Sequence, residues 1–289
     1  IDNICYAQVD LDVLIDIINL NADIPYSDYN DNGFIDPFEI AEQTWQAGFL
    51  KQLYLFNAND LPESIGDLVN LTDLKIYSTE LISLPESIGN LVNLRELRIY
   101  GYEFNSLPES IANLSLINVH LYSYDNDSTI VLPNNIDYLN TESLFLNNVS
   151  AVPNSIGAIE ELRLLMLYPC PLLMSLPDSI GNLNNLENLH IRNTQITSLP
   201  ESFGNLNNLE LLDIHETPLT SVPESFGNLN SLERLDLRET QLTSLPESFG
   251  NLNNLEILEI GETPLTSLPE SIGNLENLIQ LDVTSSQLT

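Results

Sequence analysis

The apolar positions of residues 176–289 recur with a fixed spacing. Near-copies of one segment begin at Leu176, Leu199, Val222, Leu245 and Leu268, so four copies are 23 residues long and the fifth ends one residue short. The spacing within the copies reads L-x-x-L-x-L-x-x-T-x-L, with Ile or Val at some of the Leu positions and Ser286 in place of Thr in the last copy. A unit of this length cannot bury its own apolar face and must stack on its neighbours. The pattern therefore predicts a solenoid.

The centre of each copy alternates between apolar and polar residues. In one copy Leu235 and Leu237 alternate with Arg234, Asp236 and Arg238. This alternation predicts a short strand whose leucines point inward and whose polar side chains point outward. One strand per repeat gives a parallel sheet, which we expect to line the concave face of a curved α/β solenoid.

The residues after each strand predict a tight return path. A small hydrogen-bonding residue, such as Thr217, Thr240 or Thr263, follows the last strand leucine or isoleucine and can satisfy backbone groups where the chain leaves the sheet. The next segment reads Leu-Pro-Glu-Ser-(Ile or Phe)-Gly-Asn-Leu, in which Pro246 and Gly250 disfavour a long helix. We therefore expect a convex side that is irregular or made of 3-10 turns.

The strand pattern extends back to residue 50 and predicts about eleven strands over residues 50–289. The units begin at Leu50, Leu71, Leu94, Leu116, Thr141, Leu162, Leu186, Leu209, Leu232, Leu255 and Leu278. The array ends directly after a strand, so we expect that a C-terminal cap is absent. Either the sequence is a fragment of a longer protein, or the open apolar end meets a partner, including a second copy of the chain in a homodimer.

Residues 1–49 lack the repeat and predict a helical N-terminal cap. Apolar residues at helical spacing between Val9 and Leu20 predict a short amphipathic helix. We expect a second short helix from Pro37 to Trp45, just before the first repeat strand. Such a cap would cover the apolar end of the array, with Trp45 packed there.

An acidic loop in this cap has the spacing of a calcium site. Residues 28–39 match D-x-[DN]-x-[DN]-G-x5-E at every fixed position, which is the calcium loop of an EF-hand. Oxygen ligands at alternating positions and a final Glu surround a hard cation in such loops. The predicted ligands are Asp28, Asn30, Asn32, the Phe34 carbonyl, Asp36 and Glu39. We expect a structural Ca²⁺ ion, and the alternative is a solvated acidic turn.

The outward strand positions form two rows that hold the candidate ligand-binding residues. The central row is Tyr54, Lys75, Arg98, His120, Phe145, Met166, His190, Asp213, Asp236, Glu259 and Asp282. The neighbouring row is Phe56, Tyr77, Tyr100, Tyr122, Asn147, Tyr168, Arg192, His215, Arg238, Gly261 and Thr284. From these rows we expect ligand contacts by Tyr54, Phe56, Lys75, Tyr77, Arg98, Tyr100, His120, Tyr122, Tyr168, His190, Arg192, His215 and Arg238.

Aromatic rings beside cations suit a protein segment, a sugar ring or a ligand that carries a carboxylate. The alternative is that rings and charges only stabilise one another across strands, by ~0.2–1 kcal/mol per pair. His190 and His215 lie near Asp213 in these rows, but the rows contain no Ser or Cys nucleophile. We therefore expect a non-enzymatic binding module.

The repeat resembles the leucine-rich repeat family over about residues 50–289. The Leu-Pro-x-x-(Ile/Phe)-Gly-x-Leu motif is similar to that of Ras-group intracellular scaffolds and of many bacterial surface proteins. This chain differs in having Thr at the position that usually holds Asn or Cys. The acidic loop before the array resembles that of secreted bacterial members. The resemblance implies a horseshoe fold and recognition of a protein or glycan on the concave face.

Composition limits the partners. The chain has 42 Asp or Glu residues against 8 Lys or Arg, for a net charge of −34, which argues against nucleic acid and anionic membranes as partners. No run of 18 apolar residues occurs, so we expect no transmembrane segment. The chain starts at Ile1 without Met or a basic leader.

We therefore expect a secreted or cell-surface bacterial protein whose signal peptide has been removed. A cytoplasmic scaffold of the Ras-group kind and a structural, self-associating protein are the alternatives. Several stacked repeats separate Cys5 from Cys170, so we expect two free thiols, with Cys170 buried in the core.

Overall fold

The computed structural model describes residues 5–21, 35–78, 80–101, 103–104, 107–123, 130, 132 and 134–288. The chain divides into two compact units, Ile1–Thr141 and Glu142–Thr289. The predicted boundary between the N-terminal cap and the repeat array, at residue 49, is a different one, and it stays a prediction.

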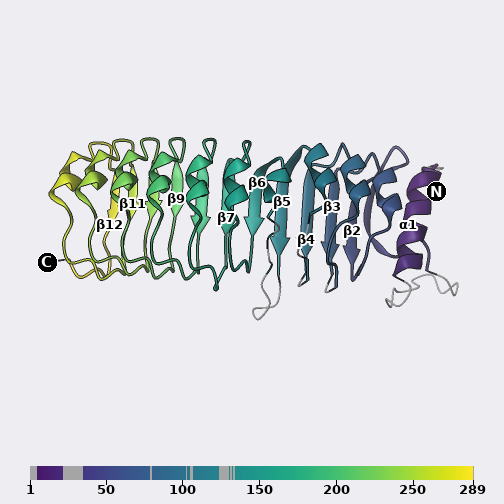
Figure 1. The fold of residues 1–289 in the computed structure, drawn as a ribbon, viewed down its shortest axis with the longest axis horizontal. Helices are drawn as coiled ribbons and strands as arrows, with labels where there is room; N and C mark the ends of the chain where they lie inside the picture. Colours follow the sequence, from purple (N-terminus) through teal and green to yellow (C-terminus); the bar gives the residue numbers. More distant parts are fainter. Residues whose placement is uncertain are drawn as a thin grey trace. The chain divides into compact units, whose positions relative to one another are not determined.

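The described residues of the first unit form one α-helix and a five-stranded sheet (Figure 1). Its elements are α1 Gln8–Leu20, β1 Ala41–Gln46, β2 Phe49–Phe56, β3 Asp73–Tyr77, β4 Glu96–Tyr100 and β5 Leu116–Tyr122. Strand β1 pairs antiparallel with β2, and β2 to β5 are parallel. The 3-10 turns of this unit are Glu63–Asp67, Glu86–Asn90, Glu109–Asn113 and Ile136–Tyr138.

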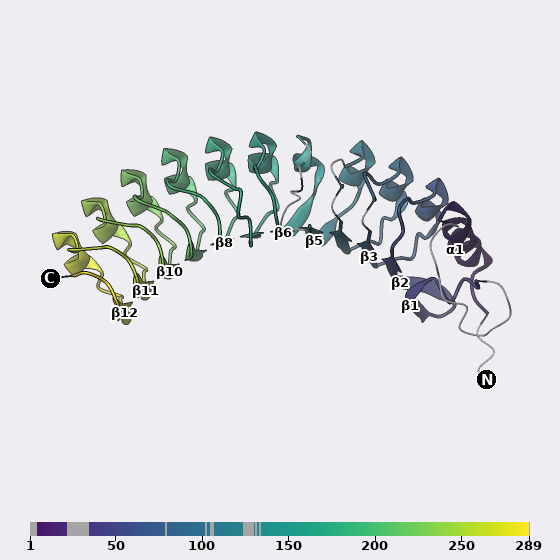
Figure 2. The same cartoon turned by 90° about the horizontal axis from the view of Figure 1, so that it is seen from below.

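The second unit is a parallel sheet of short strands. Its strands are β6 Thr141–Leu146, which starts at the last residue of the first unit, and β7 Leu164–Leu167, β8 Asn188–Ile191, β9 Leu211–Asp213, β10 Arg234–Asp236, β11 Ile257–Glu259 and β12 Gln280–Asp282. Its 3-10 turns are Asn154–Ala158, Asp178–Asn182, Glu201–Asn205, Glu224–Asn228, Glu247–Asn251 and Glu270–Asn274. Within each unit the strands lie on one side and the 3-10 turns on the other (Figure 2). The predicted solenoid of parallel strands and 3-10 turns is confirmed.

The core of each unit is a stack of leucines contributed by successive repeats. Leu232, Leu235 and Leu237 are fully buried, as the pattern predicts. On the side of the 3-10 turns, the ring centroids of Phe203 and Phe226 lie 6.2 Å apart in a stack. The ring of Phe249 stacks on that of Phe226, with centroids 6.0 Å apart. No repeat encloses these side chains alone, so the next repeat supplies the other wall of the core.

Glycine in most of the 3-10 turns allows the backbones of neighbouring repeats to approach closely. A Cβ atom on Gly227 would lie 2.2 Å from the carbonyl oxygen of Ser248 in the next repeat. A ladder of asparagine amides adds to this packing. Asn254 Nδ2 donates to the carbonyl of Asn230 at 2.6 Å, one repeat earlier. The spacing between repeats is therefore set by backbone contact as well as by leucine packing.

Two of the three threonines named for the position after the strand, Thr240 and Thr263, satisfy a backbone carbonyl as expected. Thr240 Oγ1 donates to the carbonyl of Leu237 at 2.8 Å, while the buried Thr217 Oγ1 has no hydrogen-bond partner among the described residues. Cys170 fills the same slot, and burial raises the pKa of its thiol to about 11. Cys5 is exposed and both thiols are free, which confirms that prediction.

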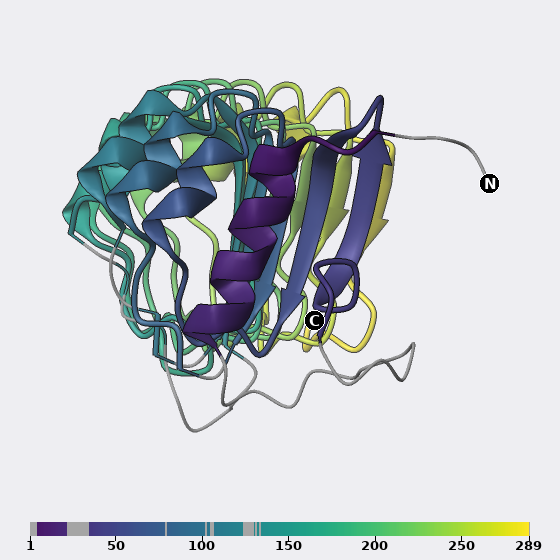
Figure 3. The same cartoon turned by 90° about the vertical axis from the view of Figure 1, so that its right-hand side faces the viewer.

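Helix α1 lies alongside β1 and β2 at the end of the first unit (Figure 3). Val13, Leu14 and Ile17 are buried, whereas Val9, which the helical pattern placed on the same face, is 54% exposed. The buried Asn21 fastens the end of the helix, because its amide donates to the carbonyl of Asp60 at 3.1 Å and accepts the amide hydrogens of residues 59 and 60.

The predicted second helix from Pro37 to Trp45 is wrong, because this segment ends in strand β1. The turn that follows β1 explains the difference. Ala47 and Gly48 have φ of 52° and 84°, the two left-handed residues that a two-residue hairpin of the I′ type requires. Strand pairing with β2 then fixes residues 41–46 in an extended conformation.

Substitution of Gly227 by Ala tests the close approach between repeats. The added Cβ has no room beside the Ser248 carbonyl, so we expect the free energy of unfolding to fall by ~1–3 kcal/mol in chemical denaturation. Gly273→Ala is the matched control, because nothing lies within 4 Å of its Cβ position. Equal losses for the two variants would contradict this account of repeat spacing.

Candidate functional site

The register of the first unit places the candidate residues in two adjacent rows. Lys75 pairs with Tyr54 on one side and with Arg98 on the other. Arg98 in turn pairs with His120 on β5. Phe56, Tyr77, Tyr100 and Tyr122 occupy the corresponding positions two residues further along the same strands. Both rows lie on one face of the sheet, because strand residues two apart share a face.

The second of these rows is a continuous stack of rings, which we call the ring row: Phe56, Tyr77, Tyr100 and Tyr122. Adjacent ring centroids are 5.0, 4.5 and 5.1 Å apart, with interplanar angles of 13°, 3° and 9°. Because adjacent rings cover each other's faces, contact with a ligand falls to ring edges and phenol oxygens. Burial and the neighbouring Tyr100 raise the pKa of Tyr77.

The central row places cations next to the ring row. Lys75 Nζ lies 4.0 Å from the centroid of the Tyr54 ring, close enough for a cation–π interaction. Arg98 forms an ion pair with Glu96 on the same strand. Burial, followed by the charges of Arg98 and Lys75, lowers the pKa of His120 to about 4. His120 is therefore neutral at pH 7.

The second unit brings four other candidates together around Asp213 and Asp236. His190 Nδ1 lies 3.3 Å and His215 Nδ1 lies 2.7 Å from the Asp213 carboxylate, which Arg192 Nε also contacts at 2.6 Å. Burial alone would raise the pKa of Asp213, but hydrogen bonds from His190 and Arg192 and the charges of His215 and Arg192 hold it well below its usual range.

The carboxylates of the following strands are paired in the same way. Arg238 donates to Asp236 through Nη2 at 2.6 Å and Nε at 3.0 Å. Arg234 pairs with Glu259 at 2.9 Å. Like charges one strand apart repel each other, so these cations neutralise a row of acidic side chains that the register brings together. The contacts of these candidate residues are thus internal to the second unit.

The donor set of Asp213, His215 and Asp236 is also one that can hold a metal ion, since its ligand atoms lie within 4.8 Å of one another. Arg192 and Arg238 already neutralise the two carboxylates. A further candidate, Tyr168, is 43% exposed, and the guanidinium carbon of Arg192 lies 5.9 Å from its ring centroid.

Most of the predicted calcium loop, including Asp28, Asn30, Asn32 and Phe34, lies outside the described residues. Asp36 and Glu39 are described and form a turn, in which the amide of Asp36 donates to the Glu39 carboxylate at 2.9 Å. The ligand set stays a prediction.

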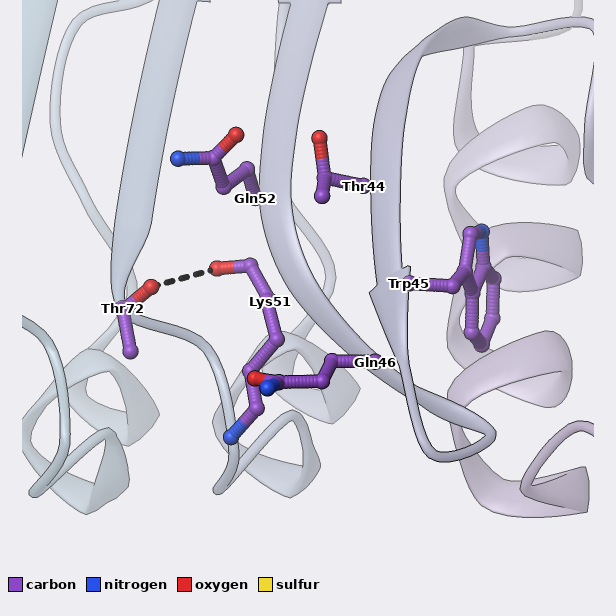
Figure 4. A pocket seen from close by; sticks show the side chains of 6 residues that line it. All are labelled: Thr44, Trp45, Gln46, Lys51, Gln52 and Thr72. Atoms are coloured by element: carbon purple, nitrogen blue, oxygen red, sulfur yellow. Dashed lines mark hydrogen bonds between the residues drawn. The ribbon is translucent and has the colours of Figure 1, made fainter.

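Sequence reasoning missed a cleft of about 420 Å³ at the start of the first unit's sheet (Figure 4). It is lined by Thr44, Trp45, Gln46, Lys51, Gln52 and Thr72. Its walls come from β1 and from the residue before β3, and its floor comes from β2. Strand β1 was expected to be a helix, so no sequence signal placed Thr44 and Gln46 beside Lys51 and Gln52.

Comparison with known proteins agrees with this fold. Residues 144–238 match a family described as leucine-rich repeat region, and residues 231–252 match the family Leucine Rich Repeat. No curated protein matches the chain in sequence. Together with the fold of both units, these matches show that the chain is similar to leucine-rich repeat proteins.

Several solved structures share the fold. A leucine-rich repeat protein of Leptospira interrogans is 26% identical, with a TM-score of 0.61 over 83% of this chain and 74% of that one. Listeria monocytogenes InlP is 24% identical, with a TM-score of 0.59 over 76% and 63%. The Arabidopsis receptor kinase HAESA, solved with a peptide hormone and a co-receptor, is 23% identical, with a TM-score of 0.57 over 97% and 54%.

Proteins of this fold are generally protein-binding modules without enzymatic activity. In the described part of the chain, no helix has the length and apolar character that crossing a bilayer demands.

Calcium binding is tested by thermal unfolding with and without a chelator. An ion bound only by the folded state stabilises it by about 2.7 kcal/mol when its concentration is 100 times Kd, so we expect Ca²⁺ to raise Tm. Glu39→Gln should abolish the shift. Glu276→Gln, which changes an exposed carboxylate in the second unit, should keep it. A Tm that does not respond to Ca²⁺ would exclude the site.

Proposed function

We propose that the first unit is a non-enzymatic module that binds a protein segment across the ring row and the cations beside it. The observation that carries this proposal is the unbroken stack from Phe56 to Tyr122, flanked by Lys75 and Arg98. Aromatic and Arg side chains are the groups that most often anchor protein interfaces.

The orientation of the rings favours a protein over a glycan. Sugars bind proteins largely by packing against open ring faces, and here the faces of Tyr77 and Tyr100 are covered by their neighbours at 4.5–5.1 Å. The edges and phenol oxygens that remain can accept and donate hydrogen bonds along an extended chain. Strand spacing repeats these groups about every 4.8 Å. A row of this kind suits a peptide better than a flat sugar ring.

Mutual stabilisation alone is the competing explanation for the ring row. Each stacked pair contributes ~0.5–1.5 kcal/mol, which is enough to justify the rings without a partner. The cations argue against this explanation, because Lys75 makes no ion pair with a described carboxylate although acidic residues outnumber basic ones by 42 to 8. A purely structural row would not need a cation held next to it.

A secreted or cell-surface location is part of the proposal. It is supported by the acidic loop ahead of the repeats, which resembles that of secreted bacterial members of the family. Fractionation of cells that express the full-length gene product tests the location, and recovery in the cytoplasm alone would contradict it.

Selection of a random peptide library displayed on phage tests the binding role. We expect the chain to enrich a family of peptides, and Tyr77→Ala with Tyr100→Ala to lose at least tenfold in affinity for them. Tyr77→Phe with Tyr100→Phe keeps the stack and removes two hydroxyls, so an intermediate loss is expected.

Tyr138→Ala is the matched control, because Tyr138 lies in a 3-10 turn of the same unit, away from the strands. Its affinity for the selected peptides should be unchanged. Peptides that bind the double alanine variant as well as the original chain would contradict the proposal. So would a glycan array on which the chain binds sugars through the same tyrosines but no peptide is enriched.

A further inference from the structure

The basic residues of the two units are partnered differently. In the second unit Arg163, Arg192, Arg234 and Arg238 each form an ion pair with a carboxylate. In the first unit Arg98 does so as well. The other three cations of that unit make no ion pair with a described carboxylate: Lys51, Lys75 and Arg95. In so acidic a chain, cations without carboxylate partners are available to an anionic ligand.

Lys51 reaches the sheet face through a β-bulge. Thr44 pairs with Gln52 and Trp45 pairs with Leu50, so Lys51 is the extra residue on β2. A bulge changes the direction of one side chain relative to strict alternation. It allows Leu50 to remain fully buried while Lys51, next to it, lines the cleft.

The cleft around Lys51 is lined by groups that can bind an anion. Lys51 Nζ donates one hydrogen bond to the carbonyl of Asn70 at 3.1 Å, which leaves two of its three donors. Figure 4 shows the amide of Gln46 beside the Lys51 side chain, with the Gln52 amide and the Thr44 hydroxyl further along the same cleft. Among the described residues, no carboxylate lines the cleft.

The cleft and the ring row lie along the same strand. Gln52, Tyr54 and Phe56 alternate on β2 and therefore share one face. The four steps from Gln52 to Phe56 span about 13 Å, the length of about four residues of an extended chain. A single short segment can therefore reach from the cleft to the ring row.

Resting on the proposed function, we propose that the partner segment is acidic and that one of its carboxylates binds in the cleft to Lys51. The amides of Gln46 and Gln52 and the hydroxyl of Thr44 complete the recognition of that carboxylate. Charge-assisted hydrogen bonds from an ammonium group are stronger than neutral ones, so the carboxylate fixes the register of the segment on the sheet.

The negative charge of the chain does not prevent this binding. At 0.15 M salt the Debye length is about 8 Å, so distant carboxylates are largely screened. Among the nearby acidic residues, Asp10 is buried, and its carboxylate accepts a hydrogen bond from the backbone amide of Leu50 at 2.8 Å. The carboxylate of Asp73 accepts a hydrogen bond from the hydroxyl of Thr72 at 2.6 Å. Glu42 lies on β1, opposite Tyr54.

Two fluorescein-labelled peptide amides test the inference by fluorescence anisotropy on the full chain at 0.15 M salt. The peptides are Tyr-Gly-Gly-Glu and Tyr-Gly-Gly-Gln, which differ only in the carboxylate. We expect the Glu peptide to bind about tenfold more tightly than the Gln peptide. Lys51→Gln should remove this preference, and Lys51→Arg should keep most of it.

Arg163→Gln is the matched control, because this cation of the second unit is already paired with Glu187, and the preference should survive it. Equal affinity for the two peptides, no measurable binding of either, or a preference that persists in Lys51→Gln would overturn the inference. Displacement of the Glu peptide by galacturonate but not by N-acetylglutamate would show that the carboxylate belongs to a sugar and would overturn it too.

These outcomes are distinguishable from failure of the proposed function. The phage-selected peptides report on the ring row, whereas the Glu-to-Gln difference reports on the cleft. Selected peptides that need Tyr77 and Tyr100 but show no dependence on Lys51 would leave the proposed function standing and remove only the acidic partner.

Discussion

Burial of leucine between successive repeats is the interaction on which the rest of this structure depends. No repeat encloses its own apolar side chains, so Leu232, Leu235 and Leu237 are buried only because neighbouring repeats cover them. Backbone contacts such as that of Gly227 with the Ser248 carbonyl reinforce the same spacing. The strands must then pair in register, one per repeat.

Constant register has opposite consequences for rings and for charges. Rings stacked about 5 Å apart attract each other, so the ring row is stable by itself. Carboxylates at the same spacing repel, and Asp213, Asp236 and Glu259 therefore need the arginines and histidines that surround them. One geometry thus produces a surface suited to a partner in the first unit and a self-neutralised charge network in the second.

The sequence predicted the features that leucine spacing encodes directly. The L-x-x-L-x-L pattern placed each repeat strand and therefore both rows, because alternation fixes which residues share a face. Helix α1 followed from its apolar spacing, although Val9 is exposed because only part of that apolar stripe meets the first repeat.

What the sequence did not reveal depends on local backbone geometry and on rotamers. Strand β1 was missed because the Ala47-Gly48 turn lacks the Asn-Gly or Asp-Gly signature of a hairpin. Lys51 was missed because the bulge that places it in the cleft breaks the alternation. The rows were predictable, but which cations reach a carboxylate was not, since that depends on side-chain conformation across strands.

The contrast between the two units is tested most directly by the free energy of unfolding of Lys75→Gln and Arg238→Gln, measured by chemical denaturation at pH 7. Arg238→Gln leaves the Asp236 carboxylate, whose side chain is only 5% exposed, without its guanidinium partner, so a loss of about 2 kcal/mol is expected. Lys75→Gln removes only a cation–π contact, so its loss should stay below about 1 kcal/mol. A larger loss for Lys75→Gln than for Arg238→Gln would contradict the assignment of a binding surface to the first unit and a structural network to the second.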